Sequence, residues 1–176
     1  MADGYPKFVW RGLFLWLALG MSLSIGITAP TATENSAVDR ILVDKSDHRL
    51  DLITDGQVIR SYRISLGSHP FGDKIRQGDK KTPEGRYVID WRNPDSRYYR
   101  ALHISYPNAA DRADARRRGV DPGGMIMIHG LPDSADGDGD GYVGLDWTDG
   151  CIALTNEEID QLWDVVKDGT PIEIVP

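Results

Sequence analysis

Cysteine is almost absent from this sequence: Cys151 is the single one among 176 residues. A single cysteine cannot form a disulfide within the chain, so its thiol is either a small buried side chain or a free and reactive group. Positive charge is also scarce, because 20 lysines and arginines stand against 27 aspartates and glutamates and leave a net charge of −7. This balance argues against a nucleic-acid-binding protein, which needs basic surface to neutralise phosphates.

Long apolar runs are absent except near the N-terminus, at residues 12–27. Two basic residues precede this run and small residues follow it, which is typical of a secretory signal peptide. Pro30 leaves the cleavage site poorly defined, so an uncleaved N-terminal membrane anchor is the alternative. We therefore interpret residues 1–33 as a signal peptide or membrane anchor with a short linker, and residues 34–176 as one folded, exported domain.

Short runs of alternating, β-branched residues predict a mainly β domain. Turn pairs such as Asp55-Gly56 separate the first of these runs and indicate consecutive hairpins. The predicted strands span residues 41–43, 50–53, 58–64, 86–91, 101–105, 125–129 and 171–175. The expected fold class is therefore mainly β (α+β), with one or two helices packed on the strands.

The clearest predicted helix covers residues 156–167. Thr155 and Glu158 form a capping box at its start, and its apolar residues fall on one face at helical spacing, which indicates core packing. A second helix is expected near residues 109–118, where Gly119 ends it.

The candidate nucleophile, Cys151, lies just before the helix at 156–167 and directly after Gly150. Glycine allows a sharp turn, and amides exposed there could bind the oxyanion that forms when a thiolate attacks an acyl group. A thiol also needs a base, and His129 is the strongest candidate because it ends an apolar strand next to Gly130. The residues alone leave open that Cys151 is a small buried side chain and His129 a structural histidine.

Several segments, in order along the chain, resemble the YkuD-type L,D-transpeptidases. His129-Gly130, followed after an insertion by residues 148–154, resembles the His-Gly and Ser/Thr-His-Gly-Cys elements of that family. Upstream, Thr82-Pro83-Glu84-Gly85 resembles its Thr-Pro-x-Gly element, and Ser65-Leu66-Gly67 resembles the strand end before it. The resemblance covers nearly all of residues 40–176 and implies an L,D-transpeptidase-like β-sandwich or barrel.

The resemblance also implies roles for the matching residues. Cys151 would be the nucleophile and His129 its base, oriented by a backbone carbonyl near Gly130. The amides of Gly150 and Cys151 would form the oxyanion hole. The implied reaction attacks a peptide bond at a diaminopimelate residue of a peptidoglycan stem peptide and forms a thioester, which an amine or water then resolves. No cofactor and no metal are implied, and the implied location is the periplasm.

Two positions depart from the family pattern: Asp149 replaces the histidine before Gly-Cys, and Ala153 replaces an arginine. A carboxylate near the thiol opposes thiolate formation, and the missing arginine removes a partner for a substrate carboxylate. With residues 102–108 and 146–151, these departures resemble the YafK-like branch. Members of that branch are associated with hydrolysing wall attachments, including the link to an outer-membrane lipoprotein. Asp149 is expected to help orient the site, and the expected substrate contacts are His103, Trp147 and Thr148.

Three alternatives to acyl transfer stay open. One is a pure hydrolase on the same acyl-enzyme route, and another is a non-catalytic peptidoglycan-binding domain in which Asp149 and Ala153 mark lost activity. The third is a calcium-binding module at residues 136–141, where three aspartates alternate with glycines. Trp147 stands where an EF-hand loop has its glutamate, so a flexible acidic loop is the favoured interpretation of that segment.

Overall fold

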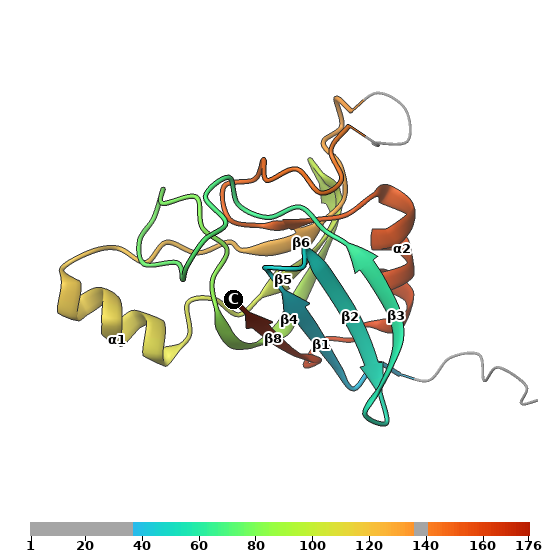
Figure 1. The fold of residues 1–176 in the computed structure, drawn as a ribbon, viewed down its shortest axis with the longest axis horizontal. Coiled ribbons are helices and arrows are strands. Elements are labelled where there is room, and N and C mark those ends of the chain that lie inside the picture. The colour runs from blue at the N-terminus through green and yellow to red at the C-terminus, as the bar shows by residue number, and fades with distance from the viewer. Residues whose placement is uncertain (1–36, 136–140) are drawn as a thin grey trace, which may run out of the picture. The chain divides into compact units, whose positions relative to one another are not determined.

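The computed structural model describes residues 37–135 and 141–176 (Figure 1). The predicted signal or anchor at residues 1–33 lies outside the described residues, and so does most of the acidic run at 136–141. No helix among the described residues has the length and apolar character needed to cross a membrane. The elements are, in chain order, β1 (Arg40–Asp44), β2 (Arg49–Thr54), β3 (Gln57–Arg63), β4 (Gly85–Ser96), β5 (Tyr99–Ile104), α1 (Ala109–Arg118), β6 (Met127–His129), β7 (Ile152–Ala153), α2 (Asn156–Val165) and β8 (Pro171–Val175).

The eight strands form one sheet in the order β3-β2-β1-β8-β4-β5-β6-β7. Neighbouring strands are antiparallel except for the pairs β1–β8 and β6–β7, which are parallel. The long strand β4 serves both halves of the sheet: residues 85–88 pair with β8, and residues 89–96 pair with β5. The register shifts between Ile89 and Trp91, which is the kind of irregularity that bends a strand.

The two edges of this sheet meet at Ser65, just beyond the end of β3. Ser65 and Ala153 of β7 exchange two backbone hydrogen bonds of 2.9 Å. Closure pairs backbone groups that an open edge would leave exposed. The predicted mainly β fold, with helices packed on the strands, is confirmed.

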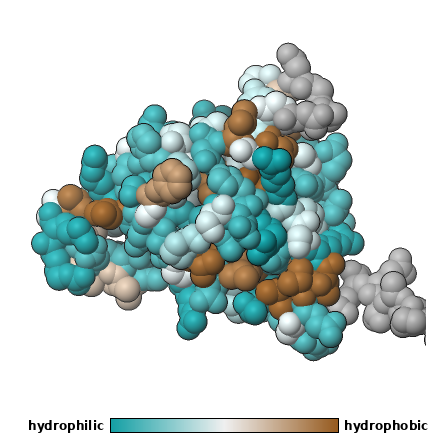
Figure 2. All heavy atoms as spheres, viewed as in Figure 1, coloured by the Kyte–Doolittle hydropathy of each residue, from teal (hydrophilic) through white to brown (hydrophobic). Residues whose placement is uncertain are grey.

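Side chains from both halves of the sheet pack into one core. Along β1 and β8 the buried residues alternate with outward-facing ones, as the period of two of a strand requires. Figure 2 shows a mostly hydrophilic surface in this view, with apolar side chains gathered in small patches. Burying a large aliphatic side chain contributes about 1.5–3 kcal/mol. Fully buried members of the core include Ile41, Leu52, Ile64, Ile89, Leu102, Ile104, Ile128, Ile152 and Ile159.

The helix α2 begins as the sequence predicts. The hydroxyl oxygen of Thr155 accepts the N–H of Glu158 at 3.2 Å, and the Glu158 carboxylate accepts the N–H of Thr155 at 3.0 Å. Its apolar face lies in the core, and Figure 1 shows the helix beside β3. The helix ends at Val165, before the predicted end at residue 167, because Val166 is already extended. The other helix, α1, has the predicted bounds.

Besides β4, which continues to Ser96 instead of ending at residue 91, two strands differ from the prediction. The strand predicted at residues 125–129 begins only at Met127, because Met125 has a φ of 56°, a left-handed conformation that a regular strand does not contain. The second, β7, has two residues, which is too short for an alternating pattern to reveal.

Candidate active site

Cys151 lies at the end of a loop that the segment 65–68 holds in place. The N–H of Thr148 donates to the carbonyl oxygen of Leu66 at 3.2 Å, and the N–H of Ser68 donates to the carbonyl oxygen of Thr148 at 2.9 Å. β7 follows directly after Cys151 and pairs with the same segment. The position of the candidate nucleophile is therefore fixed by the chain segment that closes the sheet.

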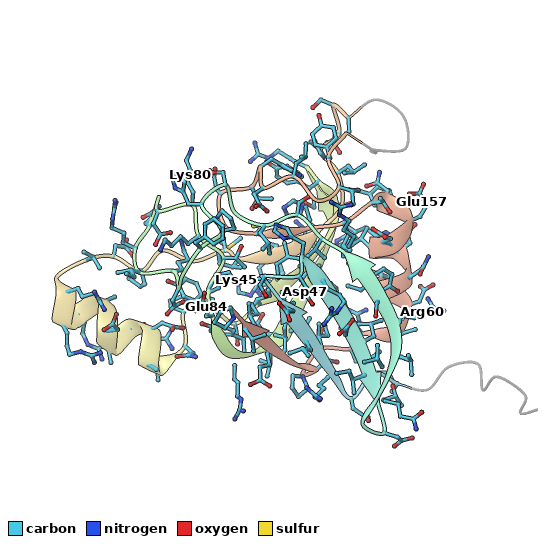
Figure 3. All side chains as sticks on the ribbon, in the orientation of Figure 1. Lys45, Asp47, Arg60, Lys80, Glu84 and Glu157 are labelled. Carbon is cyan, nitrogen blue, oxygen red and sulfur yellow. The ribbon has the colours of Figure 1, made fainter. Side chains whose placement is uncertain are left out.

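The Thr-Pro-x-Gly element holds the neighbouring loop against this segment. Thr82 is fully buried, and its hydroxyl oxygen accepts the N–H of Gly67 at 3.0 Å. Lys45 Nζ lies 2.7 Å from Glu84 Oε1, and Figure 3 shows these two side chains pointing toward one another. A Cβ on Gly67 would overlap the carbonyl oxygen of Lys80, so the close approach of the two segments requires glycine.

Thr148 shapes the turn that leads to Cys151. Its hydroxyl donates to the carbonyl oxygen of Cys151 at 2.7 Å and accepts the N–H of Gly150 at 3.1 Å. The N–H of Gly150, one of the two expected oxyanion donors, is therefore already hydrogen-bonded. The N–H of Cys151 has no hydrogen-bond partner within the described ranges. Thr148 is buried, so its geometry favours a positioning role over the expected substrate contact.

The Cys151 side chain faces the segment that precedes β6. Its Sγ lies 3.7 Å from the carbonyl oxygen of Met125. Burial raises the pKa of the Cys151 thiol, a hydrogen bond from the backbone of Met127 lowers it, and the negative charge of Asp149 raises it, with a raised pKa as the result. The resting side chain is therefore a thiol, which a base has to deprotonate.

His129, the candidate base, is neutral in the resting structure. The side chain is buried, and burial lowers the pKa of the imidazole to about 4. Nδ1 lies 2.7 Å from the carbonyl oxygen of Gly130. Because a carbonyl only accepts hydrogen bonds, Nδ1 carries the proton and Nε2 keeps its lone pair. The carbonyl that the resemblance expects to orient the base is thus that of Gly130.

The register of β6 and β7 places Cys151 and His129 on one face of the sheet. His129 pairs with Ala153, and Ile128 pairs with Ile152. Ile128 and Ile152 are fully buried in the core. The paired residues His129 and Ala153 therefore point to the opposite face. Cys151 precedes Ala153 by two residues and shares that face, roughly 7 Å from His129 along the strand direction. Among the described residues no hydrogen bond joins the two side chains, so they are neighbours and not a preformed ion pair.

Aromatic side chains enclose His129. The ring centroid of Tyr98 lies 4.5 Å from that of the imidazole, and Trp147 approaches edge-on at 5.7 Å. Tyr142 packs edge-on against Trp147 at 5.5 Å. Trp147 Nε1 is buried and has no hydrogen-bond partner in the part of the chain that the structure describes. Trp147, which was expected to contact substrate, is therefore packed against the base, where it helps to exclude the water that would stabilise an imidazolium.

A cavity of about 300 Å³ opens beside Cys151. Lys74, Gln77 and Gly78 line one part of it, residues 123–126 a second, and Asp149 and Cys151 a third. A larger hollow of about 540 Å³ lies over β2 and β3, and neither Cys151 nor His129 lines it. The smaller cavity is therefore the candidate substrate site, because a group bound there reaches the thiol.

His103 lies on the same face of the sheet, two strands away from β7. Its register partners are Met127 on β6 and Trp91 on β4. Nδ1 lies 2.6 Å from Asp90 Oδ1, and the ring stacks on Trp91 with centroids 4.7 Å apart. The structure thus holds His103 against its own neighbours and not against Cys151, and its contact with a substrate stays a prediction.

Two further residues lie at the site, and the sequence offers one of them, Tyr98, only as one of several aromatic residues that could line a substrate groove. Tyr98 covers His129 from the turn between β4 and β5, and Lys74 reaches the cavity from the loop before the Thr-Pro-x-Gly element. Tyr98 carried only a general aromatic signal. Lys74 carried none, because a lone lysine in a loop reads the same whether it faces solvent or a cavity. Within residues 37–135 and 141–176, no group of three or more His, Cys, Asp or Glu side chains is arranged to hold a metal ion.

Comparisons with known proteins agree with this arrangement. Residues 38–174 match the family model of the YkuD L,D-transpeptidase catalytic domain. The chain is 38% identical over 133 residues to the candidate L,D-transpeptidase YafK of Escherichia coli strain K12, a match that covers 72% of this chain and 46% of YafK.

Solved structures show the same fold. The helical cell shape determining protein Pgp2 from Campylobacter jejuni has a TM-score of 0.61 and 30% identity, over 78% of this chain and 47% of Pgp2. An L,D-transpeptidase from Xylanimonas cellulosilytica DSM 15894 has a TM-score of 0.53 and 19% identity, over 81% of this chain and 63% of that one. The chain spans about half the length of YafK and of Pgp2.

Proposed function

Since this chain belongs to the YkuD family of L,D-transpeptidase catalytic domains, we propose that it is a cysteine acyltransferase that remodels the cell wall. The observation that carries the proposal is the placement of Cys151 and His129 on one face of β6 and β7, with a neutral imidazole whose Nε2 is unprotonated. The proposed substrate is the peptide bond at a diaminopimelate residue of a peptidoglycan stem peptide. The steps below use only the thiol, the imidazole and backbone N–H groups.

In the first step the sulfur of Cys151 attacks the carbonyl carbon while its proton passes to Nε2 of His129. The thiol pKa is raised and the imidazole pKa is lowered, so the proton moves as the sulfur–carbon bond forms and not before. The imidazolium produced is a strong acid in its buried surroundings, and it protonates the departing amine. A thioester on Cys151 and a free amine result.

The N–H of Cys151 donates a hydrogen bond to the oxyanion that forms in the first step. The N–H of Gly150 is engaged by the Thr148 hydroxyl in the resting structure. It becomes a second donor only if that hydroxyl turns away, which its other hydrogen bond, to the carbonyl oxygen of Cys151, opposes. We expect one amide to dominate, and a single preorganised donor is worth roughly 3–4 kcal/mol of barrier.

In the second step an amine or water attacks the thioester, and His129 accepts the proton. Hydrolysis is the second candidate function, with a wall-linked outer-membrane lipoprotein as the attachment that is released. Asp149 supports it, because its exposed carboxylate lies at the cavity beside the thiol and can accept a hydrogen bond from an attacking water. Either outcome places the domain outside the cytoplasm, which fits the periplasm and the signal or anchor predicted at residues 1–33.

Intact mass spectrometry of the full chain with purified muropeptides tests the proposal. We expect a stem-peptide adduct or altered muropeptides that depend on Cys151, with none in Cys151→Ala and little in His129→Gln. The reaction is then repeated with an added amine acceptor. Products that change from free acid to amide identify transfer, and products that stay free acid identify hydrolysis. Equal binding of muropeptides by both proteins, without adduct or product, would support the non-catalytic binding domain instead.

A further inference from the structure

Two opposite charges line the cavity beside Cys151. Lys74 comes from the loop before the Thr-Pro-x-Gly element, and Asp149 comes from the loop that carries the thiol. No ion pair joins Lys74 to Asp149 among the described residues. The cavity therefore presents a cation and an anion separately to whatever group binds next to the sulfur.

Lys74 is fixed in place although it is charged. The residue is 6% exposed, and its Nζ donates to Asp79 Oδ1 at 2.8 Å and to the carbonyl oxygen of Arg76 at 3.2 Å. An ammonium group has three N–H donors, so one is left without a partner in the part of the chain that the structure describes. A charged donor that is already desolvated and held by its neighbours loses little entropy when it binds a ligand anion.

Asp79 does not neutralise this charge fully. Its carboxylate also accepts the backbone N–H groups of Ile75 at 2.8 Å, Arg76 at 3.0 Å and Lys81 at 3.2 Å. Burial raises the pKa of Asp79, but these bonds and Lys74 outweigh it and hold the pKa at about 2. Its negative charge is thus shared among several donors. Lys74 also lines the cavity, where its positive charge lowers the pKa of the Cys151 thiol against the larger effect of burial.

Asp149 supplies the opposite charge at the open side. The residue is exposed, and within the described ranges its carboxylate has no ion pair or hydrogen bond. It is close enough to Cys151 to raise the pKa of the thiol. Asp149 thus leaves a negative charge at the open side of the cavity that a ligand cation can neutralise.

We propose that this cavity binds the zwitterionic end of a diaminopimelate side chain, with Lys74 contacting its carboxylate and Asp149 contacting its ammonium group. The inference rests on the proposed function and deepens it by naming the part of the substrate that the cavity recognises. Its chemistry is a free amine and a free carboxylate on one carbon, which a lysine side chain lacks. A volume of about 300 Å³ has room for the end of one amino-acid side chain.

Binding measurements on the full chain with Cys151→Ala test the proposal without turnover. The ligands are a stem tetrapeptide containing diaminopimelate, the same peptide with the side-chain carboxylate as a carboxamide, and the same peptide with the side-chain amine acetylated. We expect each modification to weaken binding roughly tenfold or more, because each removes a charged hydrogen-bonding partner.

Second substitutions assign each penalty to one residue. With Lys74→Met, the loss of affinity caused by the carboxamide (the amide penalty) should fall below about twofold, while the loss caused by acetylation of the amine (the acetyl penalty) should stay. With Asp149→Asn, the acetyl penalty should fall and the amide penalty should stay. Lys74→Arg keeps the charge and should keep the amide penalty. Lys80→Met is the matched control, since Lys80 lies exposed on the same loop without lining the cavity, and it should leave both penalties unchanged (Figure 3). If Lys74→Met unfolds the chain, the affinities of Lys74→Arg and of the unmodified and modified peptides still test the proposal.

Two results would overturn the inference. Equal affinity for all three peptides excludes charge reading at the cavity. An amide penalty without an acetyl penalty indicates a lone carboxylate site, such as one for the leaving residue, and not a zwitterion site. Turnover of the same peptides by the unsubstituted chain separates the two proposals. Equal turnover of all three peptides would support the acyltransferase and contradict the zwitterion site. The expected binding pattern without any Cys151 adduct would support the zwitterion site and contradict the acyltransferase.

Discussion

Ser65 and Ala153 exchange two backbone hydrogen bonds of 2.9 Å, although they stand at opposite ends of the strand order. This pairing closes the sheet and at the same time anchors the loop that ends at Cys151. Cys151, the proposed nucleophile, is therefore attached both to the β2–β3 hairpin and to β6. We expect that strain in this loop lowers the stability of the whole domain as well as its chemistry.

Gly150→Ala is the most direct way to strain the loop. Gly150 has a φ of 127°, and a Cβ there would lie 2.6 Å from the carbonyl oxygen of Lys81. A residue with a side chain is strained by roughly 1–3 kcal/mol in such a conformation, and the overlap adds to that cost. Urea unfolding should therefore show a loss of about 2 kcal/mol or more. Gly141→Ala is the control, because Gly141 has open space around it. Equal stability of the two variants contradicts the prediction.

The local patterns of this sequence were sufficient to predict most of its elements. The capping box of Thr155 and Glu158 places the start of α2, because both partners lie within one helical turn. Alternating β-branched runs place β1, β2 and β3 for the same reason. The closure between Ser65 and Ala153 could not be predicted, since a pairing between distant residues leaves no local pattern. The two residues of β7 are too few to show one.

The site was predicted in part. Cys151 and His129 were recognised as a pair through the family resemblance, because sequence spacing does not reveal the register that places them on one face. The hydrogen bond between Gly150 and Thr148 depends on the rotamer of a threonine, and no pattern encodes it. Lys74 was missed because its burial results from the folding of an irregular loop.

The neutral state of His129 should make stability depend on pH. Above about pH 6.5 the imidazole is neutral in both the folded and the unfolded chain. As the pH falls, the unfolded chain binds a proton first, because the pKa in the folded chain is lowered to about 4. The contribution of neutral His129 to the free energy of unfolding is therefore complete above about pH 6.5. It is lost progressively as the pH falls toward 4, by up to ~3 kcal/mol.

Chemical unfolding of the unsubstituted chain and of His129→Gln between pH 7.5 and pH 5 measures this dependence. The variant should be less stable at pH 7.5 but should lose less stability on acidification. The difference between the two curves isolates His129 from the other histidines. Parallel curves would show that the imidazole titrates normally in the folded chain.

The thiol of Cys151 should react slowly with alkylating agents at neutral pH. Burial and the charge of Asp149 raise its pKa, so the thiolate fraction is small. Asp149→Asn removes the unfavourable charge and should speed alkylation by iodoacetamide at pH 7 roughly two- to fivefold. Glu157→Gln is the control, since Glu157 is an exposed carboxylate on α2 (Figure 3). A rate that is unchanged in Asp149→Asn would mean that burial alone sets the thiol pKa.

Asp146 should matter more than its partner histidine. Its Oδ1 accepts the N–H of Leu66 at 3.1 Å and lies 3.0 Å from His48 Nε2, so it ties the loop before Trp147 to two other segments. Asp146→Ala leaves the Leu66 N–H unpaired and should lower the free energy of unfolding by roughly 1–3 kcal/mol. His48→Ala removes only the outer contact, which is partly exposed, and should cost less than about 1 kcal/mol.

Hydrogen exchange at individual amides measures the local stability of the loop. The Thr148 N–H is protected by its bond to Leu66, and the Ser68 N–H by its bond to Thr148. Asp146→Ala should speed exchange at both amides while the core strands keep their protection, because only the local opening becomes easier. In His48→Ala both amides should exchange nearly as in the unsubstituted chain. Uniform acceleration across the sheet in Asp146→Ala would instead assign Asp146 to global stability. Equal effects of the two substitutions would show that the contact between His48 and Asp146, and not the Leu66 hydrogen bond, holds the loop.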